Sequence, residues 1–264
     1  MVSISPEQTI LAAVNSGMSQ EDLLLPEVAV LTFSRTVVEY IETLCGLINM
    51  DWLSHQHHPY AAPHVVKRGS YKGIGVSVVV PPMGSSPLSC IIEDLVHCGA
   101  KAIFLICSSW SLGPPVEFGD IIIPSFSSGR DGTSIHYGNY EEKVFPKPQV
   151  VDALASACKE ADVRFHIGGN GTCEALYRIT PGMMMEYRNQ ECVCMDNGEV
   201  NTLYSMGNSL NLVTGVIFQP YIDLTEGWKP ERLLEETYRT GCIKQADILL
   251  EACKLLDQEG FLDG

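Results

Sequence analysis

The sequence predicts a single α/β domain built on a mixed central sheet flanked by helices. Short apolar runs of strand length alternate with helical patterns along the whole chain, and this alternation is typical of a largely parallel or mixed sheet wrapped by helices. The chain has 264 residues, enough for one large domain. No linker, internal repeat or low-complexity stretch divides it, so we expect one domain over residues 1–264.

The first half of the chain contains short apolar runs, each typical of a buried strand. They cover residues 28–32, 76–81, 102–107 and 121–124.

Helical patterns lie between these strands. We expect a short capped helix within residues 1–25, a helix over 35–47 whose apolar residues share one face, and a third helix that ends before Gly99. Gly99 suits the left-handed residue that commonly follows a helix. Residues 55–63 are polar and bounded by proline, which indicates a loop.

The second half continues the alternation. In chain order we expect a helix over 148–161, a strand over 164–168, a segment from 193–195 that runs into a helix over 198–206, a strand over 210–218 and a long amphipathic helix over 230–256.

Charge and composition favour a small-molecule partner. The chain carries 17 Lys and Arg against 32 Asp and Glu, a net charge of −15. Such a field repels phosphate backbones and anionic lipid, so we expect neither a nucleic-acid nor a membrane partner. Because 45% of residues are apolar, intrinsic disorder is also excluded.

The cysteines and the first residues predict a cytoplasmic protein. The ten cysteines are scattered through apolar surroundings, as reduced thiols usually are. The first eight residues lack the features of a signal peptide, and no apolar run approaches the roughly 18 residues of a membrane span.

Hydroxyls and a glycine follow two of the predicted strands. Ser108 and Ser109 come at the end of an apolar strand, where ligands collect in open α/β sheets. The turn at Gly84 could cradle an anion on helix amides, although an ordinary helix start has the same pattern.

Two carboxylates and a histidine are candidates for binding a sugar. Asp196 and Glu199 are three residues apart just after an apolar run, so a helix would present them together to a polyol. His136 lies in a polar segment rich in hydrogen-bonding groups. Solvated surface groups would produce the same patterns.

The sequence predicts no metal site and no resident cofactor. The histidines of residues 55–58 and the pair Cys192 and Cys194 lack the partners of a metal site. No serine-nucleophile elbow, Walker loop or dinucleotide glycine pattern appears.

Several segments match a known family in order and spacing: residues 28–35, 73–86, 99–104, 119–124, 130–137, 177–180 and 194–196. In them the chain resembles the nucleoside phosphorylase superfamily, particularly its uridine- and purine-phosphorylase-like branch. The resemblance covers nearly the whole chain. It implies a single α/β domain around a mixed, distorted sheet barrel, and dimers, often assembled into hexamers, with active sites near subunit boundaries.

The family's reaction assigns expected roles to matched residues. Phosphate attacks the anomeric carbon of a nucleoside and the bond between ribose and base breaks. The resemblance implies that Arg35 and Ser108 bind phosphate and that Gly84 forms a turn of the family pattern. It also implies that Met195 packs behind the ribose. Asp196, which is one methylene shorter than the family's glutamate, would bind the ribose hydroxyls.

We also count Glu199 and Tyr177, which adjoin or belong to the matched segments, as candidate substrate-binding residues. The candidate catalytic residues are Arg35, Ser108, His136 and Gln219.

The departures from the family pattern concern phosphate and base. Leu105 stands where a strand arginine normally holds phosphate, and Cys107 and Trp110 replace glycines around the phosphate hydroxyl. Leu176 replaces the aromatic residue that stacks on the base. Gln219 falls where purine enzymes have an aspartate that acts as the general acid. Asp223 would restore that acid if the alignment shifts by a few residues.

The lost arginine alone predicts a weak phosphorylase. Truncating one member of a buried charge-assisted pair costs about 2–5 kcal/mol, which corresponds to roughly 30-fold to several-thousand-fold in rate. Phosphate is therefore a doubtful co-substrate.

Three functions remain open. The first is an enzyme that cleaves the N-glycosidic bond of a nucleoside-type substrate with weakened or absent phosphate dependence. The second is a repurposed enzyme of specialised metabolism that acts on a more apolar molecule. The third is a non-catalytic binding or storage protein on the same fold.

Overall fold

A ten-stranded mixed sheet organises the described part of the chain, which is residues 4–129 and 131–262 of the computed structural model. The strands follow the order β10-β6-β8-β9-β5-β1-β4-β3-β2, and β7 pairs with β6. Their bounds are β1 (Val28–Thr32), β2 (Ile48–Asn49), β3 (Val65–Tyr71), β4 (Ile74–Val80), β5 (Ala102–Ser111), β6 (Ile121–Ser128), β7 (Lys143–Val144), β8 (Phe165–Thr172), β9 (Cys192–Asp196) and β10 (Val213–Asp223).

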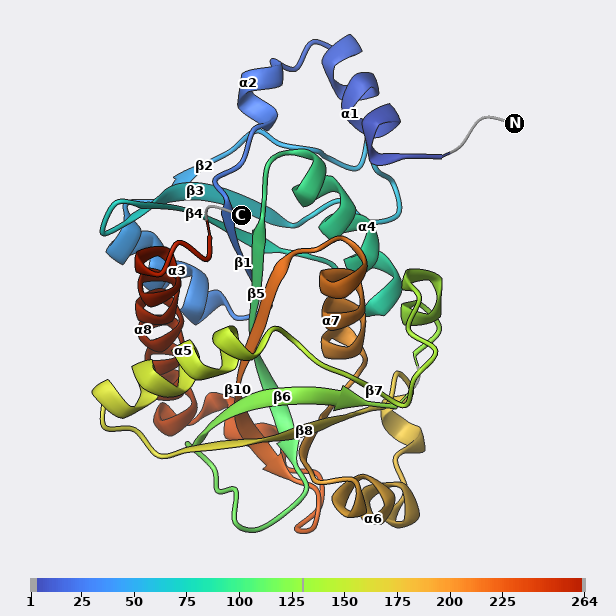
Figure 1. The fold of residues 1–264 in the computed structure, drawn as a ribbon, viewed down its shortest axis with the longest axis vertical. Helices are drawn as coiled ribbons and strands as arrows, with labels where there is room; N and C mark the ends of the chain where they lie inside the picture. Colours follow the sequence, from blue (N-terminus) through green and yellow to red (C-terminus); the bar gives the residue numbers. More distant parts are fainter. Residues whose placement is uncertain (1–3, 130, 263–264) are drawn as a thin grey trace.

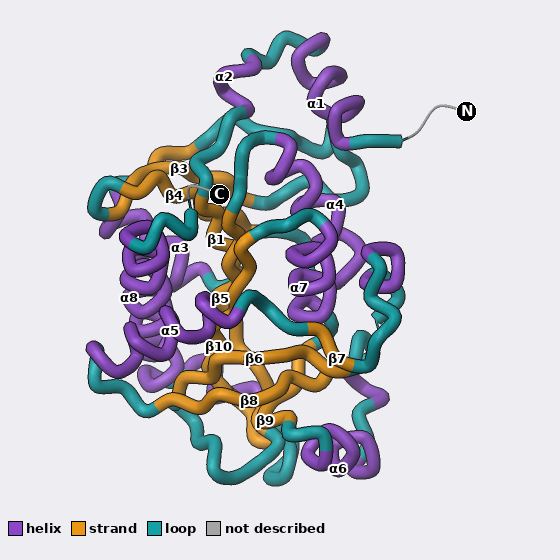
Figure 2. The backbone as a smooth tube through the Cα atoms, viewed as in Figure 1, coloured by secondary structure: helices purple, strands orange, loops and turns teal. Residues whose placement is uncertain are grey.

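Helices flank this sheet on both sides (Figures 1 and 2). The α-helices are α1 (Pro6–Asn15), α2 (Gln20–Leu23), α3 (Arg35–Cys45), α4 (Ser85–His97), α5 (Pro148–Glu160), α6 (Pro181–Asn189), α7 (Glu199–Ser209) and α8 (Glu236–Gln258). Short 3₁₀ helices are η1 (Ser134–Tyr137), η2 (Leu176–Arg178) and η3 (Pro230–Leu234).

The sheet closes on itself through β5. This strand pairs in parallel with both β1 and β10 over its first half, so Ala102 faces Val28 on one side and Val213 on the other. Its last residues pair antiparallel with β9. Together with the remaining pairings, β10-β6-β8-β9-β5 forms a closed ring, from which β1, β4, β3 and β2 extend as an open sheet. The predicted mixed, barrel-like α/β fold is confirmed.

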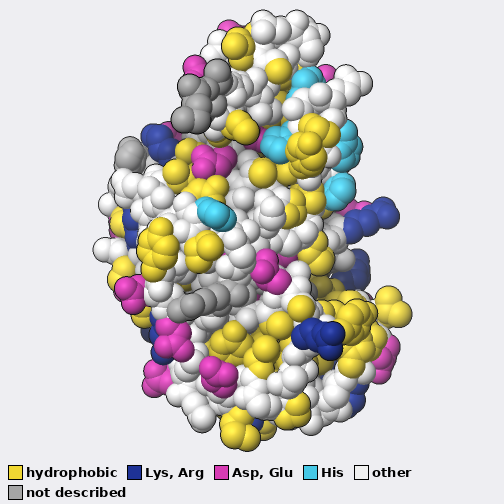
Figure 3. All heavy atoms as spheres, turned by 90° about the vertical axis from the view of Figure 1, so that its right-hand side faces the viewer, with side chains coloured by type: hydrophobic (Ala, Val, Ile, Leu, Met, Phe, Trp, Pro, Cys, Tyr) yellow, Lys and Arg dark blue, Asp and Glu magenta, His cyan; other side chains and the backbone are white. Residues whose placement is uncertain are grey.

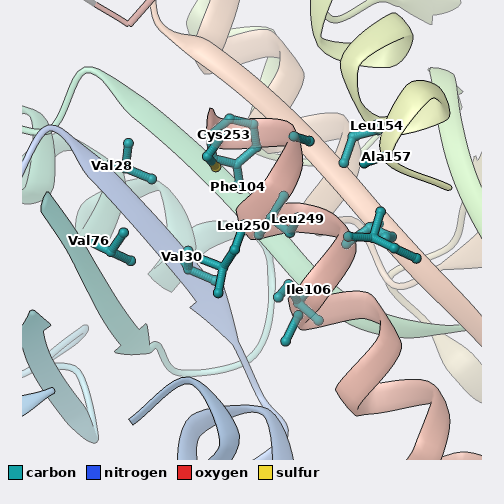
Figure 4. Packing of buried hydrophobic residues seen from close by; sticks show 14 of the residues in the cluster. Val28, Val30, Val76, Phe104, Ile106, Leu154, Ala157, Leu249, Leu250 and Cys253 are labelled. Carbon is teal, nitrogen blue, oxygen red and sulfur yellow. The ribbon is translucent and has the colours of Figure 1, made fainter. Parts of the chain in front are cut away.

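Two hydrophobic layers cover the two faces of the open sheet, because successive strand residues point to opposite sides. Phe104 and Ile106 of β5 pack with residues of α3, α5 and α8, and side chains from β1, β5, α5 and α8 meet in this layer (Figure 4). Ile103 and Leu105 point the other way and pack with residues of α1, α4 and α7. The sheet is therefore buried on both faces, as expected from continuous apolar strands.

Several predicted boundaries need correction. Residues 230–234 form η3 rather than the start of the last helix, because Glu235 has extended backbone angles and α8 begins only at Glu236. The strand predicted from residue 210 starts at Val213, because Leu210 closes α7. Within this N-terminal stretch, the described residues 4–25 form two helices, α1 and α2, rather than one.

Besides the short elements β2, β7, η1 and η2, strand β3 and helix α6 were not predicted. Strand β3 carries Lys67 and Arg68 and lies towards the edge of the sheet, so its sequence lacks an apolar run. Helix α6 has a weakly amphipathic sequence and buries only Tyr187. Gly99, by contrast, has the predicted left-handed conformation after α4, with φ 113°.

Across the residues that the structure describes, no helix is both long and apolar enough to cross a membrane.

Replacing Phe104 by alanine tests the layer beneath α8. The side chain is fully buried, so Phe104→Ala should lower the free energy of unfolding by about 3–5 kcal/mol. The matched control is Tyr177→Ala, because Tyr177 is 93% exposed and should change stability by less than about 0.5 kcal/mol. Denaturant unfolding of the two variants measures both values, and equal effects would contradict this packing.

Candidate active site

A cavity of about 490 Å³ opens where β1, β5 and β10 end. Strand β1 stops at Thr32, opposite Ile106, while β5 continues to Ser111. Between Ile106 and Trp110, where β9 begins to pair, the edge of β5 that faced β1 has no partner strand, and Cys107 and Ser108 line the cavity. Phe33 and Ser34, which follow β1, form the adjoining wall. The cavity thus lies at the carboxyl ends of parallel strands, the usual place for ligands in α/β folds.

Aromatic rings form much of the cavity wall. Trp110, Tyr221, Trp228 and Tyr238 come from β5, β10, the segment after β10, and α8. The ring centroids of Trp110 and Trp228 are 6.2 Å apart, those of Tyr221 and Trp228 6.5 Å, and those of Tyr221 and Tyr238 6.3 Å. Trp110 Nε1 donates a hydrogen bond to Tyr221 Oη at 3.0 Å, which fixes both rings. Smaller apolar side chains complete the wall: Met83, Cys107, Leu176 and Leu233.

Two hydroxyls share a hydrogen bond in the cavity. Ser108 Oγ and Tyr238 Oη are 2.5 Å apart. Burial raises the pKa of Tyr238 well above its usual range, so this phenol stays protonated at neutral pH. The pair offers a neutral donor and acceptor to a bound molecule.

Asp196 is the most firmly held carboxylate of the cavity. Its Oδ1 accepts hydrogen bonds from Asn170 Nδ2 at 2.8 Å and Thr172 Oγ1 at 3.1 Å, and its Oδ2 accepts one from the Val200 amide at 2.9 Å. These partners come from β8 and α7. Burial raises the pKa of Asp196, although the hydrogen bonds partly offset the effect.

Glu199 lies behind the cavity wall rather than in it. Its Oε1 accepts a hydrogen bond from the Gly84 amide at 3.0 Å, and the side chain is buried. Burial, and then the charge of Asp196, raise the pKa of Glu199 to about 7. Gly198, with φ 113°, makes the turn between the two carboxylates, and a Cβ there would collide with Ser85. The predicted pair is therefore close in space, but Asp196 alone faces the cavity.

A second cavity carboxylate, Glu174, was not predicted. It follows β8, and its Oε2 accepts a hydrogen bond from the Gly132 amide at 3.0 Å. Its place after a strand is the signal that could have identified it. Asn197, next to Asp196, also lines the cavity. Tyr221, Trp228 and Tyr238 were missed as well, because no motif marks them.

The structure brings four of the predicted residues to the cavity wall: Ser108, Trp110, Leu176 and Asp196. Met195 is fully buried behind this wall, paired with Trp110 across β9 and β5. Gly84 is held by Glu199 at the start of α4.

Leu105 and Gln219 lie in the interior rather than at the cavity. Leu105 is 1% exposed, because β1 and β10 still flank β5 at that position. Gln219 is fully buried beneath α8, where its Nε2 donates to the Tyr238 carbonyl at 3.1 Å. Neither side chain can reach a ligand in this cavity, which corrects their predicted placement.

Arg35, His136 and Tyr177 lie on the surface. Arg35 Nε forms an ion pair with Glu39 Oε1 at 2.7 Å, and its side chain is 90% exposed. His136 is exposed in η1; Arg130, in the same matched segment, lies outside the described residues. Tyr177 is exposed in η2, shortly before α6. On the face shown in Figure 3, hydrophobic side chains gather at the lower end of the molecule.

No cluster of three or more His, Cys, Asp or Glu side chains in the described ranges could hold a metal ion.

Comparison with known proteins agrees with this fold. The profile of the phosphorylase superfamily matches residues 27–236, and the chain belongs to this superfamily. It is 26% identical to a uridine phosphorylase of Thermococcus kodakarensis over 200 residues, which cover 71% of this chain and 69% of the relative. It is 20% identical to a guanosine phosphorylase of Halorubrum lacusprofundi over 152 residues, 58% and 63% of the two chains.

A solved structure has the same fold. Purine nucleoside phosphorylase from Toxoplasma gondii, in complex with immucillin-H, superposes with a TM-score of 0.77 at 20% identity, and the match covers 98% of this chain and 99% of that one.

The raised pKa of Glu199 predicts a pH-dependent stability. Between the usual pKa of 4.5 and about 7, the folded chain binds more protons at this site than the unfolded chain, so the free energy of unfolding falls as pH rises. Between pH 5 and pH 8, the decrease in the free energy of unfolding should be smaller in Glu199→Gln than in the unmodified chain, by on the order of 1–3 kcal/mol. Denaturant unfolding at the two pH values measures it. Glu39→Gln, which removes an exposed carboxylate, is the control and should leave the fall unchanged.

Proposed function

We propose that this chain cleaves the N-glycosidic bond of a nucleoside-type substrate with water, rather than phosphate, as the preferred nucleophile. The observation that carries the proposal is the charge of the cavity. Among the described residues that line it, two are carboxylates, Asp196 and Glu174, and none is Lys, Arg or His.

A phosphate dianion has few partners in such a cavity. Phosphate sites use arginine forks, backbone amides and hydroxyls, and the charged groups supply most of the binding energy. Here Ser34 and Ser108 offer hydroxyls, while Asp196 and Glu174 would repel the dianion. Arg35, the residue assigned to phosphate by resemblance, pairs with Glu39 on the surface. Water, being neutral, meets none of this repulsion.

Asp196 is the residue we assign to the ribose. A carboxylate fixed by Asn170, Thr172 and Val200 can accept hydrogen bonds from ribose hydroxyls without reorganising. It also places negative charge near the anomeric carbon, which becomes positive in an oxocarbenium-like transition state. The hydroxyl pair of Ser108 and Tyr238 is the neutral group available to position the attacking water.

Release of free base from a panel of purine and pyrimidine nucleosides, with and without phosphate, tests this function. We expect release that phosphate does not accelerate. Asp196→Asn should lower kcat/KM about 10- to 150-fold, the effect of losing a hydrogen bond to a charged group. Glu39→Gln, outside the cavity, should keep full activity, and thermal melting checks that both variants fold. Release that requires phosphate would contradict the proposal.

A second candidate is an enzyme that acts on a more apolar molecule than a nucleoside. The aromatic and aliphatic wall around Trp110, Leu176 and Trp228 favours it. Failure to release base from any nucleoside would overturn the first function and leave this one.

We further infer from the family a homodimer or a hexamer. Light scattering should then give a mass of two or six times the 28.9 kDa of one chain. A monomeric mass at micromolar concentration would contradict this.

A further inference from the structure

The cavity combines two features that each attract a cation. Four aromatic rings, Trp110, Tyr221, Trp228 and Tyr238, form a connected set in which neighbouring centroids are 6.2–6.5 Å apart. Two carboxylates, Asp196 and Glu174, line the same space, and no cationic side chain does so in the described part of the chain. Aromatic faces carry negative potential and attract cations, most strongly where water is excluded.

We propose that this cavity selects nucleosides whose base carries a fixed positive charge, such as a pyridinium or a ring N-alkylated purine. The inference rests on the proposed function for its chemistry, but its binding claim stands on the aromatic rings and carboxylates alone. The aromatic faces would bind the charged ring, and the two carboxylates would balance its charge.

The bond-breaking step also suits a cationic base. A neutral base leaves as an anion unless an acid protonates it. When the base is already cationic, the electron pair of the broken bond between C1′ and nitrogen neutralises it, so the base leaves uncharged and needs no proton. Water oxygen forms the new bond to C1′ and gives its proton to a carboxylate or to solvent. Atoms and charge then balance without an oxidant or a second substrate.

The groups near the cavity are poor proton donors, as a leaving base that needs no proton allows. Gln219, which replaces the expected acid, lies in the interior and has no acidic proton. Burial raises the pKa of both Tyr221 and Tyr238, so neither phenol is an effective proton donor to a leaving base.

A matched pair of probes separates charge from shape. Nicotinamide riboside carries a pyridinium, and benzamide riboside is its neutral carbon-linked counterpart, with nearly the same shape and no bond that water can cleave. Calorimetric titration of the whole chain should show at least tenfold tighter binding of the cationic probe, about 1.4 kcal/mol. Equal affinities for the two probes would overturn the inference, whether or not cleavage occurs.

Two variants locate the origin of the preference. Trp228 is 47% exposed and Glu174 is also exposed, so Trp228→Leu and Glu174→Gln should fold, which thermal melting checks. Each should reduce the ratio of the two affinities several-fold, mainly by weakening the cationic probe. Glu39→Gln removes a carboxylate outside the cavity and should preserve the ratio. A ratio unchanged in both cavity variants would overturn the inference.

Cleavage is measured separately, as nicotinamide released from nicotinamide riboside. Preferred binding of the cation, without release of base from nicotinamide riboside or from any nucleoside of the panel, supports the charge selection and overturns the proposed function. Release of neutral and cationic bases with equal kcat/KM supports the function and overturns the selection. The two failures are therefore distinguishable.

Discussion

The pairing of β5 on both of its edges is the constraint on which the structure depends. Its first half is hydrogen-bonded to β1 and β10, and its end to β9. Because these neighbours belong to the open sheet and to the closed ring, β5 holds the two parts together. The same strand therefore supplies buried core residues up to Ile106 and cavity residues from Cys107 onwards. A change in its register would disturb both at once.

Buried polar contacts fix the other side of the cavity. Asn170 and Thr172 of β8, Asp196 of β9 and the first turn of α7 meet in one hydrogen-bonded group. Such a group is stable only when its members are satisfied, and here Asp196 receives donors from elements on both sides. The closed strand ring thus positions a carboxylate at the cavity wall, beside the aromatic side chains. The local electrostatic character is anionic, which fits an overall net charge of −15.

The sequence predicted the class of fold well, because apolar periodicity reports burial directly. Strands such as β1 and β5 lie between two layers, and their runs are almost wholly apolar. Strand β3 could not be found in this way, since it is only partly buried near the edge of the sheet and carries Lys67 and Arg68. Closure of the strand ring depends on pairing between strands that are distant in the sequence, and hydrophobic periodicity does not encode such pairing. The barrel was therefore predicted only from the resemblance to the family.

The candidate site was only partly predictable. Ser108 and Asp196 follow apolar runs, and that rule placed them at the cavity, whereas Trp110 was identified only through the resemblance to the family. Leu105 was placed there too, because the residue where β1 stops cannot be read from β5 alone. Trp228 and Tyr238 come from a segment and a helix far along the chain, and only the fold brings them to β5.

The positions of the tryptophans give the molecule a built-in optical signal. The chain has three tryptophans. Trp52 is buried, with its Nε1 donating to the Leu23 carbonyl, and does not line the cavity. Trp110 and Trp228 both do, with tilted rings close enough to interact. Two of the three tryptophans therefore lie where a ligand would sit, so occupancy can be followed through intrinsic fluorescence on the unmodified chain, with Trp52 as a fluorophore away from the cavity.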